Sequence, residues 1–397
     1  MSKNILFIVN TGTISSNKNG GASVYYSHLE ILHKAGFKIQ LLAVEWSNSI
    51  SYKKEDYIEI QHMVDAIIPF KPEVELPKKG IARIIDAIIS PEIFEYYFLN
   101  RKNTFFLNEL VLEKSVDIVW SEWRWAGLLA WYSKLKIPVI YAHHDWEYKL
   151  AKLRSKRTFF GRFHTFQKKR VEFKLVKGVE GCISGSVTET KEIIQISKKK
   201  ALYIPTTYKE VTPKLLPNSI PNIIHLGGMG TTANRLGLER FLDVCWGKVK
   251  KKHPSIKLIV IGSLKQASNT LLEKLNDSNI ECLGFVKDLL EVMHPQDIHI
   301  IPWEYNTGTR TRLPLVLNYE QVLVATNESV KAFPEIKDKQ NAILCNTLDE
   351  MTLNIINIIK HKNRIYELSK AGKETFIEKF TCNSNLEKLK TFIEKIS

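Results

Sequence analysis

The chain alternates short apolar segments with longer amphipathic ones, and this alternation runs through both of its halves. The apolar segments contain few polar residues, as do strands that are buried on both faces of a parallel sheet. They lie at 3–10, 38–44, 66–69, 117–120, 138–142, 179–183 and 201–204, and then at 222–226, 257–261, 280–283, 298–301, 322–326 and 342–345. Helix-like segments separate most of them, so the sequence predicts an α/β fold of two doubly wound Rossmann-like domains that face each other across a cleft.

A polar stretch with four prolines, residues 205–221, separates the two halves and is typical of an interdomain linker. The predicted domains are therefore 1–205 and 206–381, followed by a C-terminal helix at 382–397. In such folds ligands bind beyond the carboxyl ends of the strands, so we expect the ligand to lie where those ends meet.

Composition limits the class of protein. With 397 residues, 44% hydrophobic and 25% charged, the chain is expected to be a soluble globular protein. No apolar run approaches the roughly 20 residues that span a bilayer, and the polar-flanked start does not resemble a signal peptide. Five scattered cysteines without a CxxC pair indicate reduced thiols in a cytoplasmic protein and predict no metal site.

The net charge of +15 is concentrated in one segment, residues 149–177, which holds eleven Lys and Arg and a single acid, Glu172. Five phenylalanines recur there at helical spacings, at positions 159, 160, 163, 166 and 173. A basic aromatic helix predicts an anionic membrane surface as a partner and a peripheral location at the inner membrane face. The alternative is a packed helix with its phenylalanines in the core. Nucleic acid is not expected, because no nucleic-acid-binding motif accompanies the charge.

A strand–loop–helix–strand unit at 298–326 carries the clearest sign of an anion site. The strand ends at Pro302, a loop of small residues (306–309) follows, and Arg310 and Arg312 then open a short helix. Backbone N–H groups, the helix dipole and two guanidinium groups suit phosphate oxygens. The alternative is an ordinary turn with two solvated arginines.

Polar residues also follow two strands of the first half. His143, His144, Asp145 and Glu147 bunch after the strand at 138–142, where a histidine could orient a hydroxyl group or relay a proton. Asp145 or Glu147 could fix the tautomer of that histidine or act as the base. The pair Gly20-Gly21 precedes a helix and would let a ligand approach the backbone closely.

The second half, taken in order, resembles glycosyltransferase family 4, the retaining nucleotide-sugar enzymes with the GT-B fold. The motifs that carry the resemblance are Leu226-Gly-Gly-Met, Asn234-Arg235, Ile259-Val-Ile-Gly262, the segment 283–289, Pro302 with 308–313, and the strand at 322–326. Gly20-Gly21 is similar to the loop of the family's first domain, so the resemblance spans nearly the whole chain.

The resemblance implies roles for individual residues. Arg312 takes the place of a basic residue that often precedes the family's acidic helix. Arg235 is similar to the family's diphosphate-binding lysine, and the turn at 284–287 is similar to its nucleobase loop. His144 matches a histidine near the sugar, and the C-terminal helix looks like the segment that crosses back to the first domain. The predicted catalytic residues are His144 and Asp145. The predicted donor-binding residues are Gly20, Gly21, Gly228, Asn234, Arg235, Gly262, Phe285, Val286, Thr307, Gly308, Thr309, Arg310 and Arg312.

The sequence departs from the family at the helix after Arg312. The family usually places a ribose-binding glutamate about three residues further on, and here that position is Leu315. A glycine that precedes the next strand in the family is replaced by Glu320. Leucine cannot accept hydrogen bonds from ribose hydroxyls, which removes roughly 1–3 kcal/mol of binding.

Three hypotheses follow. The first is a glycosyltransferase that moves a sugar from a nucleoside-diphosphate sugar to a glycan or lipid-linked acceptor, with retention, without a metal and without another cofactor. The second is a catalytically silent GT-B partner subunit in glycan assembly, which Leu315 motivates. The third is a phospholipid or nucleic-acid binder that acts through the basic segment.

Overall fold

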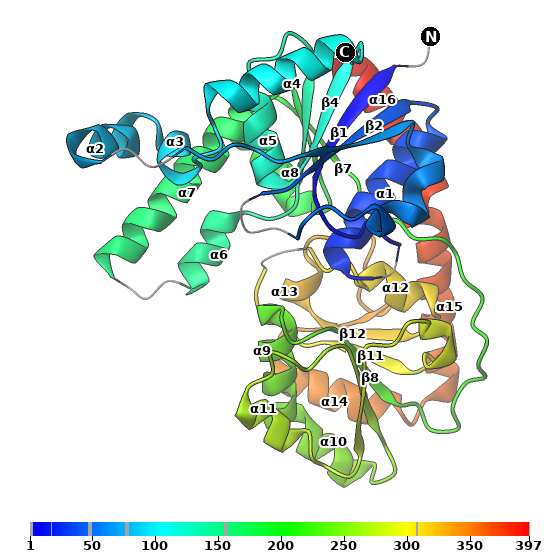
Figure 1. Cartoon of the computed structure of the whole chain (residues 1–397). Coiled ribbons are helices and arrows are strands. Elements are labelled where there is room, and N and C mark those ends of the chain that lie inside the picture. The colour runs from blue at the N-terminus through cyan, green and yellow to red at the C-terminus, as the bar shows by residue number, and fades with distance from the viewer. Residues whose placement is uncertain are drawn as a thin grey trace. The chain divides into compact units, whose positions relative to one another are not determined.

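The computed structural model describes residues 3–16, 18–46, 50–75, 79–154, 158–306 and 309–396. They form two compact units (Figure 1). The first unit holds the described residues up to Thr206, together with Thr309 and those from Asn385 on; the second holds 207–306 and 310–384. None of the helices in the described part of the chain combines the length and apolarity that a bilayer-spanning segment requires.

The described residues of the first unit contain a seven-stranded parallel sheet in the order β3-β2-β1-β4-β5-β6-β7. The chain therefore builds outward from β1 in one direction and returns to build from β4 in the other. The strands are β1 (Asn4–Asn10), β2 (Lys38–Val44), β3 (Ala66–Phe70), β4 (Ile118–Glu122), β5 (Val139–His143), β6 (Gly181–Ser184) and β7 (Lys200–Tyr203).

Helices connect these strands, except for the last helix, which follows the second unit in the chain. They are α1 (Gly20–Lys34), α2 (Gly80–Ile89), α3 (Pro91–Glu95), α4 (Arg101–Glu113), α5 (Trp123–Tyr132), α6 (Glu147–Arg154), α7 (Phe159–Gly178), α8 (Val187–Ser197) and α16 (Cys382–Ile396), with a 3₁₀ helix at Lys54–Met63. Side chains of Asn19, Thr158 and Ser186 accept backbone N–H groups in the first turns of α1, α7 and α8, as expected of N-caps. One face of the sheet joins α4, α5 and α7 in a continuous apolar core.

The second unit repeats the arrangement with a six-stranded parallel sheet in the order β10-β9-β8-β11-β12-β13. The strands are β8 (Ile223–Leu226), β9 (Leu258–Ile261), β10 (Ile280–Gly284), β11 (Ile298–Ile301), β12 (Val322–Thr326) and β13 (Ile343–Cys345). The helices are α9 (Thr232–Phe241), α10 (Gly247–Lys252), α11 (Asn269–Lys274), α12 (Leu313–Asn318), α13 (Asn327–Val330), α14 (Leu348–Ile358) and α15 (Lys362–Lys379), with a 3₁₀ turn at Leu289–Glu291. Both orders match the doubly wound Rossmann pattern, so the predicted fold class is confirmed.

Three helical segments are interrupted. The chain leaves α3 at Tyr96 and starts a new helix where Asn100 caps α4. A π-helical turn, Leu242–Trp246, separates α9 from α10. The basic segment 149–177 is not one helix: it runs from α6 into α7.

The segment expected to be a linker is tied to the second unit along much of its length. The Tyr208 hydroxyl donates to the carbonyl of Thr311 at 2.9 Å, and the amide of Val211 donates to Asn318 Oδ1 at 3.1 Å. Lys373 Nζ donates to Asn318 Oδ1 at 3.1 Å and also bonds the carbonyl of Val211. These bonds attach the segment to α12 and α15.

The space around two glycines shows how tightly a helix packs in each unit. A Cβ at Gly127 in α5 would lie 2.8 Å from the buried Tyr141 ring, whereas a Cβ at Gly247 in α10 would meet nothing within 4 Å. We expect Gly127→Ala to lower the free energy of unfolding by about 1–3 kcal/mol through overpacking. Gly247→Ala should raise it by about 0.5–1 kcal/mol, because alanine favours the helix. Urea denaturation measures both, and equal effects would contradict the packing described here.

Candidate functional site

The first unit carries a buried carboxylate at the ends of β1 and β4, the two neighbouring strands between which the strand order reverses. Glu122 is the last residue of β4, and its side chain is fully buried. Three ring nitrogens surround the carboxylate: His28 Nδ1 lies 2.6 Å and Trp120 Nε1 2.7 Å from Oε1, and His144 Nε2 lies 2.7 Å from Oε2. The cluster thus gathers side chains from α1, β4 and the segment that follows β5.

The backbone just after Glu122 is strained. Trp123 begins α5 with φ of +65°, a conformation that a bulky residue rarely adopts and that costs about 1–3 kcal/mol. Its ring stacks on Trp125 with centroids 5.5 Å apart, and the Arg124 guanidinium lies 5.6 Å from its centre. These contacts hold the sharp turn that ends β4 at Glu122.

The electrostatics of the cluster fix the histidine tautomer. Burial raises the pKa of Glu122, but the charge and hydrogen bonds of His28 and His144 bring it down to about 2. An ionised carboxylate only accepts hydrogen bonds, so the proton of His144 lies on Nε2. In neutral His144 the Nδ1 atom is then left with its lone pair for a hydroxyl group.

His144 is the accessible member of this cluster. Its side chain keeps 15% of its surface exposed, against none for Glu122, and its ring centroid lies 5.4 Å from that of Tyr25. A partly exposed imidazole held by a buried carboxylate can accept a proton from, or orient, a sugar hydroxyl. The sequence offered Asp145 or Glu147 to fix the tautomer, but the carboxylate that contacts His144 Nε2 in the structure is Glu122.

The other polar residues after β5 have different environments. His143 is buried, and its Nε2 lies 3.3 Å from Glu189 Oε2. Burial lowers the pKa of His143 to about 4 and raises that of Glu189 to about 8, so both are uncharged at neutral pH. Asp145 is half-buried beside them. Glu147 faces Arg124, with 3.9 Å between Oε2 and Nη1.

The glycine-rich loop of the first unit differs from the sequence interpretation. Gly20 and Gly21 lie in the first turn of α1, and a Cβ at Gly21 would only touch Asn19 at 3.5 Å. The conformationally demanding glycine is Gly12, directly after β1, with φ of +128°. The sequence analysis missed Gly12, Glu122 and His28. Gly12 could have been found, because it lies two residues after the end of β1, at the sheet's switch point.

The pKa of Glu122 generates a pH-dependent prediction. Glu122→Gln should lower the free energy of unfolding at neutral pH by roughly 3 kcal/mol, because the histidines lose their ionised acceptor. The folded pKa of about 2 lies below the ordinary 4.5, so the stabilisation is complete above pH 4.5 and disappears as the pH falls to about 2. The gap between wild type and variant in urea titrations should shrink over this range.

The exposed Glu109 on α4 provides the control, since Glu109→Gln should change stability little at any pH. A gap for Glu122→Gln that stays constant down to pH 2 would mean that the buried carboxylate is not ionised.

In the second unit the strands β8 and β9 end in unusually close contact. Gly227 has φ of +153° and Gly262 has φ of +134°. The amide of Gly227 donates to the carbonyl of Ile261 at 2.6 Å, and a Cβ at Gly262 would lie 2.5–2.8 Å from backbone atoms of Gly227 and Gly228. Only glycine fits at position 262.

Arg312 lies over this turn. Its Nη1 donates to the carbonyl of Leu226, and a Cβ on Gly227 would be 1.9 Å from the same nitrogen. β11 pairs with β8 only as far as His299 and Ile224, so the two strands stop pairing before their ends. The guanidinium therefore lies at the carboxyl end of β8, at the switch point of the second sheet.

The titratable side chains that act most on Arg312 are Tyr208 and Arg310, and neither is a carboxylate. Burial lowers the pKa of Arg312 to about 10; Tyr208 opposes this shift and Arg310 adds to it, so Arg312 stays protonated at neutral pH. Burial and the charge of Arg312 lower the pKa of His225 to about 3. His299 also has a low pKa, about 4, mainly through burial. A fixed cation beside two neutral imidazoles at a strand end suits an anionic ligand.

The remaining predicted residues are only partly brought together. Asn234 adjoins Gly227 and donates to the carbonyl of Gly228 at 3.0 Å, whereas Arg235 points to the carbonyl of Gln266 at 3.5 Å. Arg310 lies 5.9 Å from the Trp303 ring centre.

The loop after β10 carries an exposed Phe285 and a half-buried Val286. Thr309 is half-buried and groups with the first unit. Thr307 and Gly308 lie outside the described residues.

The structure shows the surroundings of Leu315 and Glu320, the two positions at which the sequence departs from the family. Leu315 lies in α12 and packs against the apolar clusters on that side of the sheet, so it offers no acceptor to a ribose. Glu320 has φ of +55°, the left-handed conformation that favours glycine. The backbone turn before β12 is therefore retained although its glycine is not.

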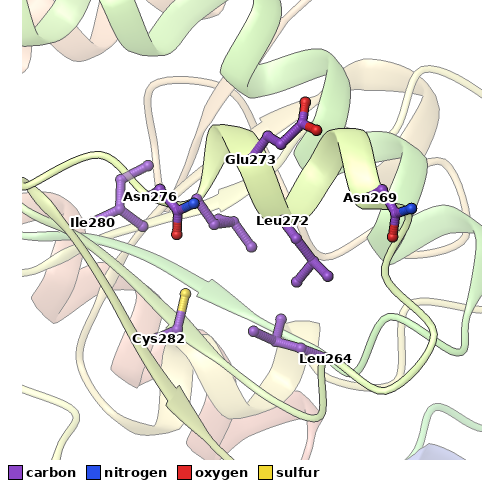
Figure 2. A pocket seen from close by; sticks show the side chains of 8 residues that line it. Leu264, Asn269, Leu272, Glu273, Asn276, Ile280 and Cys282 are labelled. Atoms are coloured by element: carbon purple, nitrogen blue, oxygen red, sulfur yellow. The ribbon is translucent and has the colours of Figure 1, made fainter.

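A hollow of about 500 Å³ lies elsewhere, between α11 and the edge strand β10 (Figure 2). Leu264, Leu272 and Cys282 line it. No predicted site residue lines it, and it lies away from the switch point, so it is not the candidate site. In the described residues no group of three or more His, Cys, Asp or Glu side chains is arranged to hold a metal ion.

The glycine contacts at the strand ends generate a stability prediction. Gly262→Ala should lower the free energy of unfolding by roughly 3 kcal/mol or more, because the new methyl meets backbone atoms in a left-handed conformation. Gly228→Ala is the matched control: its Cβ would stay 3.7 Å from Ser263, so the loss should be below about 1 kcal/mol. Thermal unfolding followed by circular dichroism would decide, and equal losses would contradict the close approach of β8 and β9.

Comparisons with known proteins agree with the fold. Residues 220–361 match the family model described as Glycosyl transferases group 1. A search of curated proteins finds no match.

Solved structures share the fold over the full length. A glycosyltransferase from Rickettsia africae has a TM-score of 0.67 and 15% identity, with 100% of this chain and 98% of that chain covered. HepE from Anabaena, in complex with UDP-glucose, has a TM-score of 0.68 and 12% identity, with 99% of each chain covered. A TarM mutant from S. aureus has 0.70 and 12%, with 98% and 99% covered. The second unit thus carries the match to Glycosyl transferases group 1, and the whole chain shares the two-domain fold of these solved glycosyltransferases.

Proposed function

We propose that this enzyme transfers a sugar from a nucleoside-diphosphate sugar to a glycan or lipid-linked acceptor. The second domain, 206–381, would bind the donor, and the first domain, 1–205, would bind the acceptor. The C-terminal helix at 382–397 completes the first domain in this proposal. Retention of the anomeric configuration is what the resemblance to family 4 implies.

The observation that carries the proposal is the placement of Arg312. Its guanidinium lies at the carboxyl end of β8, in space that the absence of a side chain at Gly227 leaves for it. A leaving nucleoside diphosphate develops negative charge, and a fixed cation stabilises that charge without reorganising. Arg310 lies two residues earlier in the same loop, and we propose that residues 307–309 complete the diphosphate site. In this scheme the side chains and N–H groups neutralise the diphosphate, and no metal is needed.

The first unit supplies the group suited to a hydroxyl. His144, held by Glu122 through Nε2, presents Nδ1 as an acceptor, and we propose that it orients a sugar hydroxyl beside the reacting centre. Asp145 would act as the second polar group there, and Gly20 and Gly21 would let the ligand approach the start of α1. Two of the similar solved proteins contain ligands of this chemical class, since the HepE structure holds UDP-glucose and the TarM mutant structure holds UDP and α-GlcNAc-glycerol.

We also propose a cytoplasmic enzyme that associates with the inner membrane face through the basic segment 149–177. A lipid-linked acceptor lies at such a surface, and the cations would favour anionic headgroups. Nucleic acid is not part of this proposal.

A second candidate function rests on Leu315. Because this side chain packs in the apolar core, the second domain holds the ribose by other groups or does not bind the nucleotide. In the latter case the protein would be a catalytically silent partner subunit in glycan assembly.

Calorimetry with a panel of nucleoside diphosphates and their sugars separates the two functions. The enzyme should bind at least one member, and Arg312→Ala should weaken that binding by about tenfold or more, because a charged hydrogen bond to phosphate is lost. The control is Arg364→Ala, which removes a partly exposed arginine paired with Glu367 in α15. Absence of binding to any nucleotide would favour the silent subunit, and equal binding by wild type and Arg312→Ala would contradict the proposed diphosphate site.

A further inference from the structure

Helix α2 turns its apolar face outward. Isoleucines at 81, 84, 85 and 88 recur at the spacing that places them on one face of the helix, and between 48% and 77% of each side chain is exposed. Ile89 beside them is 66% exposed, while Ala87 on the opposite side is buried. A helix of a globular domain normally buries such a face, so these side chains call for a partner.

Polar contacts explain why α2 is held in this orientation. The carbonyl groups at its C-terminal end point toward α7: Arg170 donates to those of Ala87 and Ile88, at 3.2 and 2.5 Å, and Lys174 to that of Ile89 at 3.2 Å. Cations at a helix C-terminus satisfy its free carbonyls and its dipole. The polar end of α2 is thus fixed on α7, and its isoleucine face is left uncovered by the described residues.

The first half of α7 extends the same kind of surface. Phe159 and Phe160 are 78% and 81% exposed, and Phe163 and Phe166 are 39% and 56% exposed. Phe163 lies edge-on to Phe94, and the guanidinium of Arg83 in α2 lies over the same Phe94 ring. The exposed phenylalanines of α7 therefore adjoin α2. The sequence left open that the five phenylalanines of this segment pack in the core. Of these five, Phe173 does so, against the apolar core of the first unit. In Figure 1, α2 and the start of α7 project from the sheet of the first unit.

Cations flank this apolar surface and outnumber acids on the same elements. Arg162 and Lys169 are exposed on α7, and Lys79 is exposed just before α2. Between residues 158 and 178 there are six Lys and Arg but only Glu172 as an acid, and Glu172 is buried against Arg124. Exposed apolar side chains within a cationic border match the interface of an anionic bilayer, where the apolar groups enter the acyl boundary and the cations meet headgroups.

We propose that the isoleucine face of α2, together with the exposed phenylalanines of α7, inserts into an anionic phospholipid bilayer. This deepens the proposed function, on whose lipid-linked acceptor it rests, and it assigns the insertion to α2 rather than to the basic segment alone. A second copy of the chain is the less suitable occupant, because pairing two such surfaces would bring two cationic borders together.

Vesicle co-sedimentation tests the proposal without donor or acceptor, so its outcome is independent of sugar transfer. The full chain should bind vesicles that contain phosphatidylglycerol, bind pure phosphatidylcholine vesicles more weakly, and lose affinity as salt rises. The double variant Ile84→Ser/Ile88→Ser should weaken binding to the anionic vesicles by about tenfold or more, because two inserting side chains are removed. The matched control is Phe105→Ser/Leu112→Ser, which removes two side chains of α4 that are 67% and 73% exposed.

A second measurement covers the case in which the double variant fails to fold. In an Ile85→Trp variant the tryptophan emission should shift to shorter wavelength when anionic vesicles are added. Unchanged vesicle binding by the Ile84→Ser/Ile88→Ser variant, or no binding by wild type, would overturn the proposal. A dimer in sedimentation velocity that this variant dissociates, without vesicle binding by wild type, would assign the surface to a second copy instead.

Discussion

The carboxylate of Glu122 is buried inside the first sheet as an ion, and this arrangement is stable only because three N–H donors converge on it. Taking a carboxylate out of water costs several kcal/mol, which such donors must offset. The donors belong to α1, to β4 and to the segment after β5. The charge therefore fixes the positions of these elements around the point where β1 and β4 part, and the orientation of His144 depends on it.

The second sheet places a charge of opposite sign at the same point of its strand order. Arg312 comes from the loop before α12, but it is held at the end of β8 by the carbonyl of Leu226. The nearby His225 and His299 are neutral at neutral pH, so Arg312 is the charged group among these three side chains. One strand order, used twice, thus produces a carboxylate-held imidazole in one unit and a guanidinium in the other.

The strands were predictable because a parallel strand buried on both faces is nearly all apolar, and periodicity then identifies the helices between strands. The helix α2 was missed although its isoleucines recur at helical spacing; that spacing indicates a helix, but it does not say whether the apolar face is buried or exposed. In the site, Arg312 and His144 were found from their places after strands. Glu122 and His28 were missed because a buried carboxylate on a strand and a histidine inside a helix carry no local signal; only the tertiary fold brings them within 2.6 Å.

The segment after Thr206 has a consequence for how this protein can be divided into fragments. Its prolines and polar residues suggest a cut anywhere between 205 and 221, but hydrogen bonds attach Tyr208 and Val211 to the second unit. A fragment that began at Pro221 would lack Lys209 and Val211. Asn318 would then lose the amide that donates to its Oδ1 and the carbonyl that accepts from its Nδ2, and Lys373 would lose the carbonyl of Val211. The second unit, expressed by itself, should therefore begin at Thr207.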